Sequence, residues 1–332
     1  MRFGPVPVGD AIGSVLAHTL RADDLHLKKG RVLTPADVTA MLRAGVDQVV
    51  VAMPQDGDVL EDVAATILAR ALVPNPDAAC VSVTRATTGR VNLNAVGPGI
   101  VELDADAIFR MNSLHPEITL ATLAPMTRVT RRMLVATVKI ISYAVPRADL
   151  ERACQVVAGA IRVRPVVRRS AGLVLTTVPG QKESLNDKAQ EAVLTRLSAL
   201  GVELSEVRIV PHDAAEIGTA LREIKGEVAL ILTGSATSDL YDTGPEGLRA
   251  AGGHVARFGL PVDPGNLLFH GAIDGRPVIG LPGCARSPAL NGADWVLERI
   301  VCGLEIHDAD VAAMGVGGLL KEIPSRPHPR EG

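Results

Sequence analysis

Three segments in the second half of the chain combine hydroxyl, charged and glycine residues at spacings that suit the binding of an anionic group. The first contains Thr177, Lys182 and Ser184, and it leads from an apolar stretch into an amphipathic one. Hydroxyl and ammonium groups beside a helix N-terminus, where free backbone N–H groups point outward, hold phosphates and other oxyanions. An ordinary polar turn between a strand and a helix has the same composition, so both interpretations stay open for this segment.

The second segment, residues 233–244, is the most informative because it follows the most apolar stretch of the chain. Gly234 allows a ligand to approach the backbone closely. Asp239 and Asp242 are the predicted catalytic residues, and Asp242 is also the predicted Mg²⁺ ligand. The alternative is that both carboxylates cap turns or the next helix. The predicted ligand contacts in this segment are Thr233, Gly234, Ser235, Thr237 and Ser238.

The third segment, residues 280–287, reads Gly-Leu-Pro-Gly-Cys-Ala-Arg-Ser and precedes a predicted helix. Free N–H groups of that helix, together with Arg286 and Ser287, predict a second anion site, although Pro-Gly is also a generic turn. A fourth segment, residues 263–266, precedes a strand and could fold over the same cleft. The predicted contacts of these two segments are Pro264, Gly265, Asn266, Pro282, Gly283, Cys284, Arg286 and Ser287.

Strands and helices alternate around these segments. Apolar stretches predict strands at 171–176, 202–210, 228–233, 255–260, 267–273 and 277–281, and helices at 185–200, 213–224, 245–251 and 288–301. Such alternation is typical of βαβ units, so we expect an α/β domain with a doubly wound, mostly parallel sheet over residues 166–305. Because ligands bind beyond the carboxyl ends of the strands in such sheets, the segments should meet at one edge.

The first part of the chain, residues 1–165, has the pattern of a mixed α+β region rich in short strands. A helix should begin at Thr34-Pro35 and end near Gly45, with further helices at 60–73 and 147–160. Strands are predicted at 48–52, 81–84, 91–94, 99–103 and 134–144. The pattern leaves the topology open, including a division into more than one subdomain. Residues 306–332 are predicted as a tail or linker, charged and rich in proline from Lys321 onward.

The composition excludes several classes of function. The chain has 332 residues, a length that suits two domains. Hydrophobic residues make up 47% of it, which allows a substantial core. A net charge of −3 and an aromatic content of 2% argue against nucleic acid and anionic membranes as partners. The four cysteines form no C-x-x-C pair, which argues against a zinc site and suits a reducing cytosol. With no signal-peptide pattern and no apolar run of about 18 residues, we expect a cytoplasmic protein.

The order and spacing of the segments resemble the molybdopterin-binding domain shared by molybdopterin adenylyltransferases and molybdopterin molybdenumtransferases of the MoeA and gephyrin type. The family's Thr-Gly-Gly-x-Ser-x-Gly with a following acidic residue is similar to residues 233–239 with Asp242. Its Pro-Gly-Lys-Pro is similar to residues 264–267, and its Gly-Leu-Pro-Gly-Asn-Pro-x-Ser to residues 280–287. In the first half, residues 16–20 and 29–35 are similar to early segments of the molybdenumtransferase type.

The chain departs from the family pattern at several positions. Ser235 stands in place of the second glycine, Asn266 in place of the lysine and Cys284-Ala285 in place of the Asn-Pro pair, and residues 177–180 lack the acidic pair of the first loop. With these departures the chain resembles the molybdopterin-binding half of bacterial bifunctional proteins, in which a nucleotidyltransferase half follows. The present sequence contains no such second half.

Three functions are open at this point. The chain could bind molybdopterin, with or without a nucleotide, and pass it to a nucleotidyltransferase or a molybdoenzyme. It could instead be a molybdenumtransferase that inserts molybdate into adenylylated molybdopterin with Mg²⁺, with Asp242 at the reacting centre and with Lys182 and Arg286 holding phosphate or molybdate. The same fold could also bind another nucleotide or phosphate. The missing lysine and acidic pair favour the first function, and the resemblance further implies a homodimer.

Overall fold

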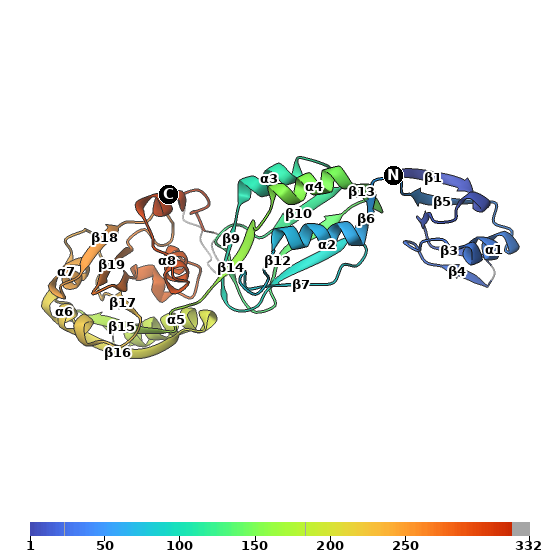
Figure 1. Ribbon diagram of the computed structural model, residues 1–332. Coiled ribbons are helices and arrows are strands. Elements are labelled where there is room, and N and C mark those ends of the chain that lie inside the picture. The colour runs from blue at the N-terminus through green and yellow to red at the C-terminus, as the bar shows by residue number, and fades with distance from the viewer. Residues whose placement is uncertain (23, 183, 321–332) are drawn as a thin grey trace. The chain divides into compact units, whose positions relative to one another are not determined.

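A computed structural model describes residues 1–22, 24–182 and 184–320 of the chain. The chain divides into two compact units, whose elements are labelled in Figure 1. Unit 1 comprises residues 1–97 and 101–164, and unit 2 comprises residues 98–100 and the chain from Pro165 onward. None of the helices in the described ranges has the length and apolar character that crossing a membrane requires.

Unit 1 begins with short antiparallel strands around one helix. In a three-stranded sheet, β5 (Gln48–Met53) lies between β1 (Arg2–Pro7) and β2 (Val15–Leu16), while β3 (Leu20–Ala22) and β4 (Leu25–Leu27) pair with each other. The 3-10 turn η1 (Val8–Asp10) and the helix α1 (Pro35–Arg43) complete this part. Its core consists of aliphatic residues between positions 8 and 51. The predicted strand at 48–52 and the predicted helix after Thr34 are both present.

The N-terminus of α1 is fixed by a capping box. The Thr34 hydroxyl accepts a hydrogen bond from the Asp37 N–H, and the Asp37 carboxylate accepts one from the Thr34 N–H at 3.0 Å. Arg31 Nε donates to the same carboxylate at 3.0 Å. The Arg31 guanidinium, assisted by Thr34 and opposed by burial, lowers the pKa of Asp37 to about 2. Asp37 is therefore ionised at neutral pH and holds the start of the helix.

The rest of unit 1 has a separate aliphatic core, built from residues between positions 59 and 163. A four-stranded sheet has the order β10-β12-β8-β7, and smaller sheets have the orders β11-β9-β14 and β13-β6. The strands are β6 (Asp58–Leu60), β7 (Val81–Val83), β8 (Arg90–Ala95), β9 (Gly99–Leu103), β10 (Ile118–Thr122), β11 (Arg128–Val129), β12 (Leu134–Ile140), β13 (Ala144–Pro146) and β14 (Ile161–Pro165). The helices are α2 (Glu61–Leu72), α3 (Ala105–Asn112) and α4 (Arg147–Val156).

Two predictions for unit 1 need correction. The strand predicted at 134–144 is two strands, because β12 pairs with β10 and β8 whereas β13 pairs with β6. The Ser142 hydroxyl stabilises the bend between them by donating to Glu117 Oε2 at 2.8 Å. The helix predicted at 147–160 ends at Val156. The sequence pattern also missed α3 and β10 entirely.

Unit 2 is built on one six-stranded sheet of order β16-β15-β17-β20-β19-β18. Neighbouring strands run parallel from β16 to β20, and β19 is antiparallel to both of its neighbours. The strands are β15 (Ser170–Thr177), β16 (Glu203–Pro211), β17 (Val228–Leu232), β18 (His254–Phe258), β19 (Phe269–Ile273) and β20 (Arg276–Gly280). The other elements are α5 (Ser184–Leu200), α6 (Ala214–Glu223), α7 (Thr243–Ala250), η2 (Gly283–Arg286), α8 (Gly292–Val301) and α9 (Asp308–Ala313).

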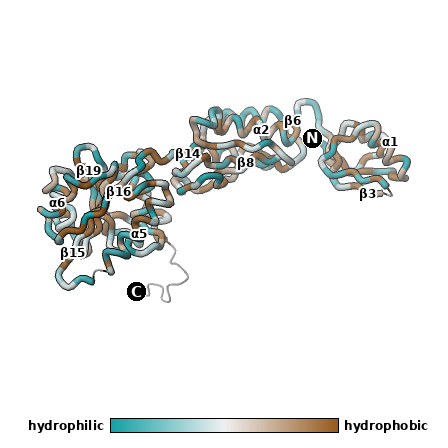
Figure 2. Tube along the Cα trace, turned by 90° about the horizontal axis from the view of Figure 1, so that it is seen from below, coloured by the Kyte–Doolittle hydropathy of each residue, from teal (hydrophilic) through white to brown (hydrophobic). Residues whose placement is uncertain are grey.

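Helices cover both faces of this sheet. Val174 and Ile231 pack with residues of α6 and α7 in one hydrophobic cluster. Leu173 and Leu230, whose side chains point to the opposite face by strand alternation, are also fully buried. In Figure 2 the hydrophobic residues of unit 2 gather in the interior, along the strands. The predicted doubly wound, mostly parallel α/β sheet is confirmed, and it has the mixed β-rich region before it.

Two segments of unit 2 differ from prediction. The helix expected at 288–301 begins only at Gly292, where Asn291 and Asp294 form a capping box. Residues 306–320, predicted as the start of a tail, are folded: they include α9, and Val311 and Met314 are buried. The Asp263 N–H donates to the Gly318 carbonyl at 2.8 Å, which ties this segment to the domain. Residues 321–332, predicted as the charged end of the tail, lie outside the described residues.

The capping box of α1 gives a pH-dependent prediction. Because the pKa of Asp37 is lower in the folded protein, at about 2 against a usual 3.8, its contribution is complete above pH about 4 and disappears as the pH falls towards 2. Asp37→Asn should therefore speed amide exchange in α1 at pH 7, relative to the wild type, with the difference shrinking between pH 4 and pH 2. Hydrogen exchange with mass spectrometry measures this. Asp47→Asn, an exposed neighbour, is the matched control. Equal protection of wild type and Asp37→Asn at pH 7 would contradict the assignment.

Candidate functional site

The four segments singled out in the sequence lie at the same edge of the unit 2 sheet. Leu175 pairs with Leu232 near the carboxyl ends of β15 and β17. Gly280, at the end of β20, pairs with Phe269, at the start of the antiparallel strand β19. The segments after β15, β17 and β20 and the segment before β19 therefore all leave the sheet on one side. This is the edge at which open α/β sheets bind ligands.

The first and second segments are in direct contact. The Gly234 N–H donates to Thr176 Oγ1 at 2.7 Å. A Cβ atom on Gly234 would lie 2.6 Å from Gln181 Oε1 and 2.8 Å from the Thr176 carbonyl oxygen. Glycine is therefore required at this position because the first segment packs against it. The close approach predicted for a ligand is made here by another loop of the chain.

Arg286 joins the second and third segments. Its Nη2 donates to the Thr233 carbonyl oxygen. Its Nε is buried and has no hydrogen-bond partner among the described residues. Burial lowers the pKa of the Arg286 guanidinium, but arginine stays protonated at neutral pH. The edge thus contains a half-buried positive charge with an N–H whose acceptor is missing, which costs about 1–3 kcal/mol.

The third and fourth segments meet at the start of α8. The Asn291 side chain donates to Cys284 Sγ at 3.0 Å, and the Gly292 N–H donates to the Pro264 carbonyl at 2.8 Å. Gly265 has a φ of +137°, and a Cβ there would lie 2.7 Å from the Gly292 nitrogen. A glycine is needed at 265 for both reasons. The fourth segment therefore packs against the start of α8, close to the third.

Asp242 and Asp239 have structural partners. Asp242 is the N-cap of α7: one of its oxygens accepts from the Ser238 N–H at 2.8 Å and the other from the Thr243 N–H at 2.7 Å. The Ser238 N–H, supported by Thr243 and by nearby His212 and opposed by burial, lowers the pKa of Asp242. Asp239 Oδ1 accepts from the Tyr241 N–H at 2.8 Å. Both carboxylates close turns, which is the alternative that the sequence left open, and their chemical roles stay predictions.

The predicted contact residues differ in exposure. Thr233, Thr237, Gly265 and Pro282 are buried. Half-buried positions include Thr177, Gly234, Pro264, Gly283, Arg286 and Ser287. The exposed ones are Lys182, Ser184, Ser235, Ser238, Asp239, Asn266 and Cys284. No group of three or more His, Cys, Asp or Glu residues able to hold a metal occurs in the described ranges. A Mg²⁺ ion at Asp242 would thus need further oxygens from a ligand.

The predicted anion site of the third segment relied on free N–H groups of a helix that starts after residue 287; that premise is wrong, whereas the roles of Arg286 and Ser287 stay predictions. The N-terminus of α8 is closed by its own capping box, in which the Asn291 side chain accepts from the Ala293 N–H at 3.0 Å. The turn η2 and an extended stretch separate that helix from Gly280. Any anion-binding N–H groups of the third segment must therefore come from residues 283–287.

Sequence reasoning missed several residues at this edge. Thr176 is fully buried and links Gly234 to His212, whose Nδ1 lies 2.9 Å from Thr176 Oγ1. His212 follows the edge strand β16, and no motif marks it. Gln181 Nε2 donates to Asn186 Oδ1 at 2.9 Å and so holds the first segment against α5. The signal that could have identified Thr176 and His212 is their position at or just after the end of a predicted strand, whereas Gln181 lies further along the loop.

Arg196 was also missed, because it occupies the buried face of α5 instead of a loop. Its Nε donates to Asp294 Oδ1 at 2.8 Å, and both side chains are almost fully buried. Its terminal nitrogens donate to two carbonyl oxygens of the third segment, those of Ala285 at 2.7 Å and Ser287 at 2.7 Å, and to that of Ala289 at 3.1 Å. These carbonyls are consequently engaged outside any α-helix, and α8 starts after them.

The Arg196 contacts lead to a stability prediction. Arg196→Met would leave Asp294 buried without this guanidinium and would release the third segment, so we expect a loss of about 3–5 kcal/mol in the free energy of unfolding of unit 2. Trp295, the only tryptophan, lies beside Asp294, and its fluorescence in a urea titration reports on this unit. Lys188→Met changes an exposed residue of the same helix and serves as the control. Similar midpoints for both variants would show that the buried ion pair does not hold the fold.

The fold and the common edge of the loops define an α/β domain that can be compared with known protein families. Residues 169–300 match the family model described as a probable molybdopterin binding domain. This part of the chain is therefore similar to a molybdopterin-binding family of molybdenum cofactor biosynthesis, and the match covers less than half of the chain. Residues 5–53 match a domain family of unknown function. A comparison with curated proteins gave no match.

Solved structures similar to this chain include two proteins named for the molybdenum cofactor. The molybdopterin biosynthesis protein MoeA from Pyrococcus horikosii is 12% identical, with a TM-score of 0.31, over 91% of this chain and 75% of that one. A molybdenum cofactor biosynthesis protein from Pyrococcus furiosus is 13% identical, with a TM-score of 0.23, over 96% of this chain and 66% of that one. The protein CinA from Thermoplasma acidophilum is 15% identical, with a TM-score of 0.27, over 36% of this chain and 90% of that one.

Proposed function

We propose that unit 2 binds molybdopterin, or its nucleotide, at the carboxyl edge of its sheet and serves the biosynthesis or delivery of the molybdenum cofactor. The observation that carries the proposal is the meeting of the four segments at that edge, within the stretch that matches the molybdopterin-binding family model. An anionic ligand of this kind suits a site whose hydrogen-bond donors are backbone amides, hydroxyl groups and a few charged side chains. The whole chain carries a net charge of −3, so local donors must hold an anion.

Arg286 is the residue that fits this ligand best. Molybdopterin ends in a phosphate, and a phosphate oxygen is the kind of acceptor that the buried Nε of Arg286 lacks. Lys182 and Ser184 add an exposed ammonium and a hydroxyl near the start of α5. Because α5 has 17 residues, its N-terminal amides also favour an anion. The proposed binding is therefore electrostatic and uses residues from separate loops.

We favour ligand binding over metal insertion because of two features of the loop residues. The carboxylate oxygens of Asp242 each accept a backbone hydrogen bond, which serves the fold first. The exposed position 266 carries asparagine where the resembling family has lysine, so one cation is missing at the edge. A binding protein would pass its ligand to a nucleotidyltransferase or a molybdoenzyme in the cytoplasm. We propose that it does so as a homodimer.

The proposal is tested by the pterin that co-purifies with the full chain. We expect about one pterin per chain in wild type, measured by mass spectrometry with metal analysis on the same sample, and a loss of at least about tenfold in Arg286→Met, because a charge-assisted contact to phosphate disappears. Arg222→Met removes an exposed arginine from α6 and is the matched control. Wild-type protein without pterin, or an unchanged pterin content in Arg286→Met, would contradict the proposal.

A molybdenumtransferase activity is the second candidate, and the position of the Asp242 carboxylate at the loop edge favours it. An ionised carboxylate at this edge could hold Mg²⁺ together with ligand oxygens. We expect no AMP release when adenylylated molybdopterin, molybdate and Mg²⁺ are added to the chain. Release that falls by a factor of about 100 or more in Asp242→Asn, with circular dichroism unchanged, would instead establish this second candidate.

A further inference from the structure

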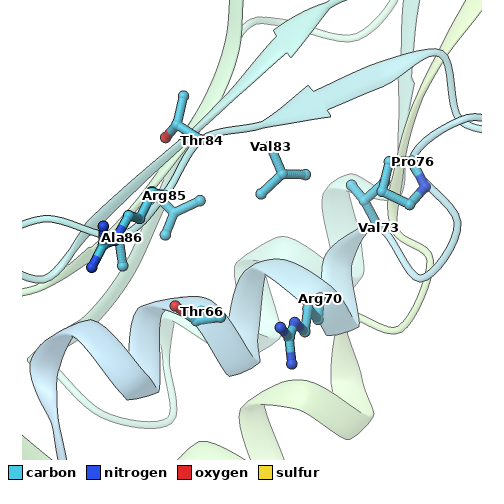
Figure 3. Close-up of a pocket in the computed structure, with 9 residues that line it drawn as sticks. Thr66, Arg70, Val73, Pro76, Val83, Thr84, Arg85 and Ala86 are labelled. Atoms are coloured by element: carbon cyan, nitrogen blue, oxygen red, sulfur yellow. The ribbon is translucent and has the colours of Figure 1, made fainter.

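A groove runs along α2 in unit 1, on the side that faces the β7–β8 hairpin (Figure 3). It consists of two adjoining hollows of about 390 Å³ and 310 Å³. The hollows share Thr66, Arg70, Arg85 and Ala86, so they form one elongated space. In Figure 3 Thr66 and Arg70 lie on the helix, opposite Arg85 and Ala86 on the strand side. The apolar part of the lining is Val73, Pro76, Val83 and Val91.

The groove borders an open sheet edge. β7 is the last strand of the order β10-β12-β8-β7 and pairs only with β8 among the described strands. The Thr84 N–H donates to the Asn92 carbonyl at 3.0 Å, and Val96 donates to Cys80 at 3.1 Å. In an antiparallel ladder the residues between these pairs turn their N–H and C=O groups outward. Val83 therefore offers its backbone polar groups to a further strand, and the Arg85 N–H and C=O make no backbone hydrogen bond within the described residues.

The charges along the groove are positive. Arg70 and Arg85 are both exposed, and neither guanidinium has a hydrogen bond or ion pair within the described part of the chain. Asp62 is the acidic residue of the groove, and its Oδ1 already accepts from the Gly89 N–H at 2.6 Å. The groove thus has two guanidinium groups without a partner among the described residues and one carboxylate that already accepts a hydrogen bond. The groove therefore complements an occupant with acidic groups.

We propose that this groove binds an extended acidic peptide segment of another protein, which adds to β7 as a further strand. The stretch that lines it, residues 62–73, consists of most of α2 and its C-cap Val73 and is about 16 Å long at 1.5 Å per residue. That length matches about five residues of extended chain at about 3.3 Å each. Alternate side chains of the added strand would point towards α2, apolar ones against Val73 and Val83 and acidic ones towards Arg70 and Arg85. Backbone hydrogen bonds to Val83 and Arg85 would supply sequence-independent affinity.

The test uses a display library of random seven-residue peptides, selected on the full chain. We expect the recovered peptides to carry Asp or Glu together with apolar residues at every second position, because those positions face α2. Their affinity, measured by fluorescence polarisation, should fall at least about tenfold in Arg70→Glu and in Arg85→Glu. Arg110→Glu, which reverses the charge of an exposed arginine on α3, should leave it unchanged. In wild-type protein, hydrogen exchange at the Val83 and Arg85 amides should slow on peptide binding.

Two results would overturn the proposal. One is a selection that yields no peptide whose affinity depends on Arg70 and Arg85. The other is inorganic phosphate displacing the recovered peptides while the Val83 and Arg85 amides exchange as in the free protein, because the groove would then be a small-anion site without strand addition. All three arginines are exposed, so the variants should fold, and circular dichroism checks this.

Discussion

The buried guanidinium of Arg196 is the interaction on which the candidate site depends. A buried charge is tolerated only when it is paired and when its remaining N–H groups find acceptors. Asp294 supplies the opposite charge, and the carbonyls of residues 285, 287 and 289 supply the acceptors. The cost of burying the charge is thus offset only while the third segment keeps its shape. One side chain thereby joins α5, the third segment and α8 into a fixed base for the sheet edge.

The parallel sheet explains why segments far apart in sequence meet. Parallel strands need a crossover between them, so consecutive strands of this kind end on the same side and their loops gather there. The antiparallel strand β19 brings the segment before it to that edge as well. Close backbone packing then decides which residues fit. Gly234 and Gly265 stand where a Cβ would collide with a neighbouring loop or helix start, so their presence follows from the loop architecture.

How far the sequence predicts this structure depends on the range of the interactions involved. The strands and helices of unit 2 were predictable because their apolar periodicity is local, and so was the common edge of the four segments, because topology follows from alternation. The start of α8 was not, because it depends on Arg196, about 90 residues away along the chain. His212 and Thr176 carry no motif, and their contact arises only when β15 and β16 pair. In unit 1 the short strands left the topology open, and the bend at Ser142 depends on Glu117, from the turn before β10.

Most of the departures from the family pattern lie at exposed positions. Ser235, Asn266 and Cys284, which differ from the resembling family, are exposed at the edge, and Ala285 is a departure that is buried, as are Thr233, Gly265 and Pro282, which agree with the family. The shared residues therefore specify how the loops pack, and their presence alone indicates an architecture more than a reaction. The exposed changed residues are the ones that would face the ligand we propose. A chain that keeps the architecture and alters the facing side chains is expected to keep a related ligand while losing chemistry that depended on those side chains. This is the physical reason to place binding ahead of metal insertion.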